Sequence, residues 1–316
     1  MKYIHIYNNR TEYNAVEKEI YDMSLIRNED NLVLFSKNVP NIERIYEEEY
    51  FTIEITQGGY FTVAAAIQNV TKAYSPLNID YSFNEGDWIS TQITRTGLTF
   101  NCIAGDSIRF RGTNTTYCNN LDAGNNTHKQ WYVIFGIVGH DDWFGEEDAH
   151  GANYYKNIDE FMHTTCKFNV CGNIMSLLYG DNFVGQTTLP STYTFANLFK
   201  TSNVVSAEHL ILPSTTLTKR CYSCMFSKAY YLETSPEFIA ETLSSECMHY
   251  AFETCESLTK ITFLATNANK STNTNNFMSG TPDTSDCIFI KNPNVTAASI
   301  KTTCGIPENW TIQDYV

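Results

Sequence analysis

The 316-residue sequence predicts a multi-domain protein of the α+β class, and three observations carry this prediction. Residues 1–48 combine a short apolar run with a helical period, which predicts a small α+β module. Residues 49–172 alternate apolar and polar side chains in short runs, the pattern of an antiparallel β-sandwich. Residues 173–265 repeat with a period of 26 to 27 residues, typical of a short solenoid, and residues 266–316 close it with a β cap.

The N-terminal module is expected to begin with a strand at Tyr3–Ile6. Thr11 can cap a helix whose apolar residues share one face. Two further apolar runs, residues 23–26 and 32–35, are joined by a polar turn and predict a β-hairpin.

The sandwich prediction depends on seven short runs separated by turns rich in glycine and asparagine. The runs are residues 51–56, 60–63, 79–83, 88–90, 98–102, 108–111 and 167–170. A long segment at about 114–165 interrupts them, and we expect it to be an insertion on a rigid scaffold, where function is often added.

The insertion holds the candidate binding residues. Aromatic rings beside a carboxylate are typical of surfaces that stack on sugar faces, and they predict a glycan or partner site. Its members are Trp131, Trp143, Tyr154, Tyr155 and Asp142. A metal ion is an alternative, with His140, Asp142 and His150 as ligands, but their spacing matches no metal motif, so we expect no metal. Packing on a neighbouring subunit or over an edge strand would explain the same residues without a ligand.

Phenylalanines mark the register of the repeats, because Phe199, Phe226 and Phe252 stand 27 and 26 residues apart. Two units also carry apolar residues four positions apart, which predicts a short helix with one buried face. These residues are Leu217, Cys221 and Met225 in one unit and Leu243, Cys247 and Ala251 in the next. Such helices are too short to be stable alone, so the units must stack, with Cys221 and Cys247 as small buried thiols.

The cap, residues 266–316, is expected to start with an Asn/Thr-rich loop at 266–276. A strand at 287–290, a short helix at 293–303 and a last strand at 310–312 follow. A polar outer face there would prevent end-to-end association of the solenoid.

The repeat unit resembles the BspA-type leucine-rich repeats of gut Bacteroidales and their phages. The residues that carry the resemblance are Leu212, Pro213, Leu217, Cys221, Tyr222, Met225 and Phe226. The N-terminus resembles a leader shared by virion proteins of crAss-like phages, through Tyr3, Ile4, Tyr7 and Tyr13. This likeness implies that residues 1–48 are a particle anchor, as in a head fibre, a capsid decoration or a tail protein.

Composition limits the classes of function. The formal charge is −14 and the pI is near 4.9, so nucleic-acid binding has no electrostatic support. The N-terminus has no apolar signal region, and no apolar run approaches the length of a membrane span, so we expect neither Sec export nor a membrane span. The motifs of nucleophilic hydrolases and phosphate-binding loops are absent, so we expect no enzyme and no cofactor.

The sequence therefore predicts a structural and interaction protein on the virion surface, made in the host bacterial cytoplasm. Its expected partners are other virion proteins and a host surface polysaccharide or mucin glycan, and we expect a homo-oligomer, a trimer by analogy with symmetric vertices. One alternative is a bacterial cell-surface adhesin with leucine-rich repeats. Another is a glycan depolymerase, in which Asp142 with Glu146 or Glu147 would supply an acid/base pair.

Overall fold

The computed structural model describes residues 22–28, 31–38, 44–68, 77–93, 97–113, 131–137 and 163–316. The chain divides into two units, residues 1–45 and 46–316.

The described part of the first unit is a β-hairpin. Strands β1 (Asp22–Asn28) and β2 (Asn31–Asn38) pair antiparallel, which confirms the hairpin expected from the two apolar runs. The expected first strand, the helix after Thr11 and the anchor residues lie outside the described residues. Those anchor residues are Tyr3, Ile4, Tyr7 and Tyr13.

The second unit is mostly β-structure. Its first half comprises η1 (Tyr46–Glu48), β3 (Phe51–Gln57), β4 (Gly59–Gln68), β5 (Leu77–Phe83), β6 (Ile89–Ile93), β7 (Leu98–Cys102), β8 (Ser107–Gly112) and β9 (Trp131–Ile137). Its second half comprises β10 (Lys167–Asn173), α2 (Ser176–Tyr179), η3 (Gly180–Asn182), β11 (Val204–Ile211), β12 (Thr234–Phe238), β13 (Lys260–Phe263), β14 (Ile288–Lys291), α3 (Ala297–Cys304) and β15 (Thr311–Asp314).

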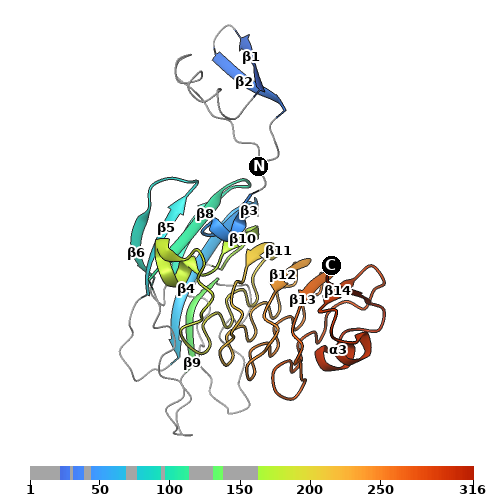
Figure 1. Cartoon of the computed structure of the whole chain (residues 1–316). Coiled ribbons are helices and arrows are strands. Elements are labelled where there is room, and N and C mark those ends of the chain that lie inside the picture. The colour runs from blue at the N-terminus through green and yellow to red at the C-terminus, as the bar shows by residue number, and fades with distance from the viewer. Residues whose placement is uncertain are drawn as a thin grey trace. The chain divides into compact units, whose positions relative to one another are not determined.

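One ten-stranded mixed sheet runs through this unit in the order β15-β14-β13-β12-β11-β10-β3-β8-β5-β6. Strand β10 pairs antiparallel with β3 on one side and parallel with β11 on the other. The antiparallel and the parallel strands therefore belong to the same sheet, and Figure 1 shows β11 to β14 following β10 side by side. The sheet continues across residues 172 and 173, where the sequence suggested a change of domain.

A separate three-stranded antiparallel sheet, β7-β4-β9, packs on the antiparallel half of the large sheet. Phe61 of β4 lies 6.4 Å from Phe110 of β8 and 5.4 Å from Phe168 of β10, between ring centroids. All seven runs predicted as strands in residues 49–172 overlap a strand. Strand β9 lies inside the predicted insertion and was not expected.

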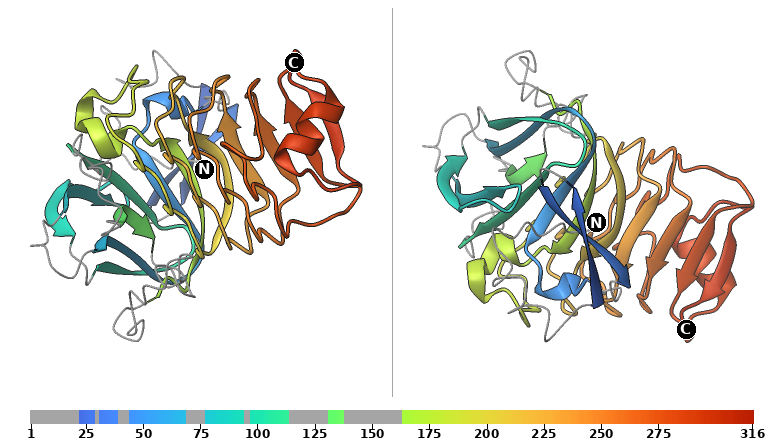
Figure 2. Two further views of the ribbon diagram at one scale, coloured as in Figure 1. Left: turned by 90° about the horizontal axis from the view of Figure 1, so that it is seen from below. Right: turned by 90° about the horizontal axis from the view of Figure 1, so that it is seen from above.

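The repeats are built from strands and turns, so the helices predicted at Leu217–Met225 and Leu243–Ala251 are wrong. Through these segments, and through the corresponding segment of the first unit, every fourth residue has a left-handed backbone. The positions are Tyr193, Asn197 and Thr201, then Arg220, Cys224 and Lys228, then Glu246, Tyr250 and Thr254. Backbone groups bond to the next coil instead of along a helix, as in Tyr222 N to Cys247 O at 3.0 Å. Figure 2 shows these coils stacked in sequence beside the antiparallel strands.

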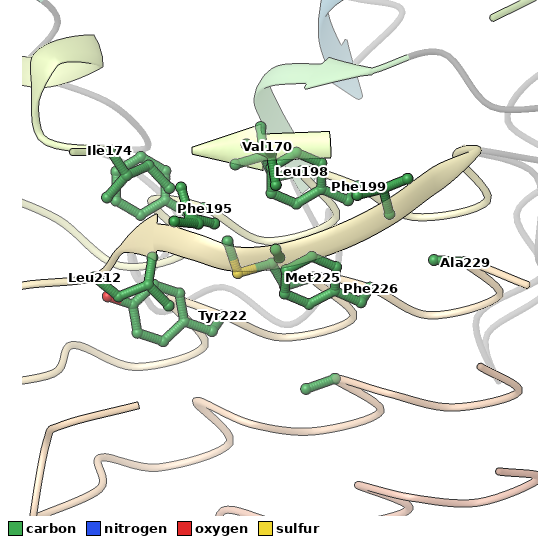
Figure 3. Packing of buried hydrophobic residues seen from close by; sticks show 14 of the residues in the cluster. Val170, Ile174, Phe195, Leu198, Phe199, Leu212, Tyr222, Met225, Phe226 and Ala229 are labelled. Carbon is green, nitrogen blue, oxygen red and sulfur yellow. The ribbon is translucent and has the colours of Figure 1, made fainter. Parts of the chain in front are cut away.

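The apolar residues still face inward because the turns also recur every four residues. Cys221, Met225 and Ala229 are fully buried, and Figure 3 shows Met225 with Phe226 and Phe199 in the packed interior. The ring of Phe226 stacks on Phe199 at 5.0 Å and on Phe252 at 5.4 Å, so the phenylalanine register confirms the predicted stacking of units.

The expected loop at 266–276 is in part a further coil. Tyr250 N donates to Asn275 O and Phe252 N donates to Phe277 O, both at 2.9 Å. Strand β14, helix α3 and strand β15 then confirm the three elements predicted for the cap. The hydroxyl of Thr296 caps α3 by accepting from Ser299 N at 3.2 Å.

Candidate functional site

The residues proposed from the insertion fall almost entirely outside the described part of the chain. These are His140, Asp142, Trp143, Glu146, Glu147, His150, Tyr154 and Tyr155. Trp131 is the first residue of β9, and its backbone pairs with Gln68 of β4. A candidate site in the described residues must therefore come from other side chains.

The outer face of the antiparallel strands carries such a group. Phe51 and Phe110 pair across β3 and β8 and are fully buried, so the residues on either side of them point to the opposite face. Strand pairing then brings Asp80 opposite Arg111, and Ser82 opposite Arg109, on that outer face. We call the side chains gathered there the Trp88 cluster, which consists of Tyr50, Asp80, Trp88, Arg109, Arg111 and Asp181.

Arg111 is the centre of the cluster. Its Nε lies 2.9 Å from Asp80 Oδ2 and its Nη1 lies 2.5 Å from Asp181 Oδ1. Its guanidinium carbon lies 4.3 Å from the centroid of the Trp88 ring, a cation–π geometry. Two carboxylates, from β5 and η3, and one indole, from the turn before β6, thus fix the position of Arg111.

Tyr50 holds the other side of the cluster. Its hydroxyl donates to Asp181 at 3.0 Å, and its ring meets Trp88 edge-on at 4.8 Å and Phe183 at 5.1 Å. Burial, together with the nearby Asp181 carboxylate, raises the pKa of Tyr50, so this hydroxyl remains a donor at neutral pH. Burial alone would lower the pKa of Arg111, but its hydrogen bonds to Asp80 and Asp181 raise it.

A tight turn between β5 and β6 delivers Trp88. Asn84 and Glu85 adopt left-handed backbone conformations there, and Gly86 N donates to Phe83 O at 3.0 Å. The hydroxyl of Ser82 closes the turn by donating to Gly86 O at 2.7 Å. Trp88 itself is partly exposed, so part of the indole reaches solvent from a fixed backbone.

Arg109 differs from Arg111 in its partners. One Nη donates to Ser82 Oγ at 2.9 Å, and the guanidinium carbon lies 5.4 Å from the Trp88 centroid. Its Nε is buried without a hydrogen-bond partner. Among the described residues no carboxylate forms an ion pair with Arg109.

The cluster can offer a partly exposed aromatic ring, flat guanidinium groups and directed hydrogen-bond donors. Its two carboxylates both form ion pairs with Arg111. Sequence reasoning placed Trp88 in a predicted strand and gave it no role. Alternation along Asp80–Ser82 and Arg109–Arg111 was the available signal that these polar residues share an outer face.

The parallel half contains a small cavity of about 10 Å³, lined in part by Leu212, Ser214, Tyr222 and Met248. The hydroxyls of Ser214 and Tyr222 are buried there without a hydrogen-bond partner among the described residues. A space of this size accommodates about one water molecule, so it is too small for a sugar or an organic cofactor.

The cysteines of the repeats behave as buried apolar side chains. Cys221 and Cys247 occupy equivalent positions, are fully buried and are free thiols, as predicted. Burial raises the pKa of Cys247 to about 12 and that of Cys102 to about 11, which suppresses thiolate formation at neutral pH. Cys287 and Cys304, which frame the last loop, are also free thiols.

Within the described ranges, no group of three or more side chains is arranged to hold a metal ion. No helix in the same residues has the length and apolar character needed to cross a bilayer. Comparison of the chain with protein-family models, curated proteins and solved structures found no match. The candidate function therefore depends on the residues and their geometry.

Proposed function

We propose that this chain is a structural and interaction protein of a phage particle. Residues 1–48 would anchor it to the capsid or tail, and the remainder would be displayed outward for adhesion to host or mucus glycans. The repeats resemble those of gut Bacteroidales and their phages, and the N-terminal leader resembles that of crAss-like virion proteins. Both resemblances support the assignment to a phage particle.

For the displayed body we propose a β-sandwich joined to BspA-type leucine-rich repeats. The packing of sheet β7-β4-β9 on the antiparallel half of the large sheet supports the sandwich. Parallel strands β11 to β14, joined by coils in phase with the phenylalanine register, support the repeats.

The Trp88 cluster is the observation that carries the adhesive role. Sugars are bound by aromatic rings that cover their C–H faces and by planar polar groups that bond their hydroxyls. Here an indole, a phenol and two guanidinium groups lie together beside strands β5 and β8. Arg111 is held by Asp80 and Asp181 before any ligand arrives, which lowers the entropy cost of binding.

The adhesive role is tested by measuring binding of the full chain to immobilised host capsular polysaccharide and mucin, with Trp88→Ala as the variant. Loss of a central aromatic side chain typically costs about 2 kcal/mol or more, so binding should fall about 30-fold. Tyr60→Ala is the matched control, because Tyr60 is an exposed aromatic residue of β4 in the other sheet. Equal loss in both variants, or binding that Trp88→Ala leaves intact, would contradict this role.

The particle assignment has a separate test. Mass spectrometry of purified virions should detect the chain in fixed ratio to the capsid protein. Recovery only in host membrane or surface fractions would instead support a bacterial cell-surface adhesin that uses the same face.

A further inference from the structure

We propose that the Trp88 cluster selects an acidic saccharide, and that Arg109 binds its carboxylate or sulfate group. This inference depends on the proposed glycan binding and adds the chemical class of the ligand. It is based on a difference between the partners of two arginines that lie on the same face of the sheet.

Arg111 and Arg109 project from β8 two residues apart, yet only one of them is neutralised. Arg111 is bound by two carboxylates, whereas Arg109 bonds within the described residues only to the uncharged hydroxyl of Ser82. A guanidinium group carries five N–H donors in a planar fork that matches the geometry of carboxylate and sulfate. Arg109 uses one Nη donor on Ser82, which leaves the outer N–H groups of the fork for a ligand, whereas its Nε is buried without a partner.

The position of Arg109 suits a sugar acid better than a free anion. Its guanidinium carbon lies over the Trp88 ring, 5.4 Å from the centroid, so one monosaccharide can contact Arg109 and the exposed part of the indole together. The partly exposed indole would cover the apolar C–H face of the pyranose ring, while the acidic substituent would meet Arg109. A small inorganic anion would use only the second of these contacts.

Charge balance indicates that the selection is local. The chain carries a formal charge of −14, and the two arginines and two aspartates of the cluster sum to zero. General attraction would therefore not draw a polyanion to this protein. Directed hydrogen bonds from Arg109 would bind such a polymer. Salt screens these short contacts less than it screens the interaction between exposed charges that lie far apart.

The test uses the full chain and two matched pairs of polymers: polygalacturonate with its methyl ester, and dextran sulfate with dextran. Each pair differs in its charged groups and shares its backbone. Wild type should bind at least one acidic member about 10-fold or more tightly than its neutral partner. Arg109→Gln should abolish that preference, because binding to the acidic polymer should fall further than binding to its neutral partner, and Arg109→Lys should restore part of it.

Lys301→Gln is the charge-matched control, because it removes one positive charge from α3, outside the cluster. The acidic member that binds identifies the group as carboxylate or sulfate. Equal binding of acidic and neutral members, or a preference that survives in Arg109→Gln, overturns the inference and leaves the proposed glycan binding standing. Failure to bind any of the four polymers, host polysaccharide or mucin overturns both.

Discussion

Replacement of Phe226 by alanine tests whether the antiparallel and parallel halves of the body form one cooperative structure. The side chain is fully buried and stacks between Phe199 and Phe252 with interplanar angles of 8° and 3°. Buried Phe→Ala changes cost about 3–5 kcal/mol, so we expect a loss of about 4 kcal/mol. Because domains are stable by only about 5–15 kcal/mol, Phe226→Ala should remain folded but become marginal.

The alkylation rates of buried thiols along the chain show which parts of the structure the substitution destabilises. Cys102 and Cys166 lie in the antiparallel half, Cys247 in the repeats, and Cys304 at the end of α3. A loss of about 4 kcal/mol increases the open population by about 10³. If the continuous sheet unfolds as a unit, the alkylation rates of all these thiols should increase by that factor. The rates are measured by mass spectrometry, under conditions in which the protein refolds faster than the thiols are alkylated.

Ile103→Ala is the control, because the Ile103 side chain is 71% exposed and its loss should change stability by less than about 0.5 kcal/mol. The reasoning is refuted if Phe226→Ala accelerates only the thiols of the repeats. That result would mean that β10 joins two structures that unfold separately. A shift in the urea midpoint no larger than that of Ile103→Ala would refute the estimate itself.

Three further predictions concern the backbone and the thiols. Thr254→Gly should raise the free energy of unfolding by up to about 1 kcal/mol in urea titrations, because a β-branched residue with φ of 56° is strained. A loss of stability would show that the side-chain contacts of Thr254 outweigh the strain. Ser176→Ala should cost about 2–3 kcal/mol in the same assay, since the hydroxyl accepts from Phe51 N and donates to Phe110 O, both at 2.9 Å, and an unchanged midpoint would contradict this. The free energy of unfolding should fall as pH rises above about 8.5, because the Cys247 thiol ionises there in the unfolded chain while burial holds its folded pKa at about 12. The fall should be smaller in Cys247→Ala. Equal pH profiles of the two proteins would refute the contribution of Cys247.

The repeats show how far the sequence pattern leads. The spacing of Phe199, Phe226 and Phe252 correctly predicted stacked units with a common core. The same apolar spacing of four residues wrongly predicted helices, because a string of four-residue turns buries every fourth side chain much as an α-helix does. Arg220 and Cys224 give no local sign of a left-handed backbone, which usually favours glycine or asparagine. Bonds to the next coil select these turns, and a single unit does not contain that partner.

The Trp88 cluster was beyond sequence reasoning for a related cause. Alternation in β5 and β8 indicates which residues share a face, but Asp80 and Arg111 are 31 positions apart and Asp181 lies 70 positions beyond Arg111. Their meeting depends on the order β3-β8-β5-β6 and on η3 lying beside β8. Only pairing across the sheet contains that information.

The continuous sheet also explains why so few repeats are sufficient. A solenoid needs a neighbour for every coil and a polar end. The first coil keeps little of the repeat sequence, yet its Phe199 lies 6.1 Å from Phe51 and its Leu198 carbonyl accepts from Ile137 N at 3.0 Å. The antiparallel half therefore serves as its preceding neighbour. At the other end Phe238 pairs with Phe263 on the next strand, and Phe263 pairs with Lys291 on the strand after that. Lys291 is bound to Asp314 of β15. The apolar row thus ends in an ion pair at the last strand, where a further coil would require another apolar side chain.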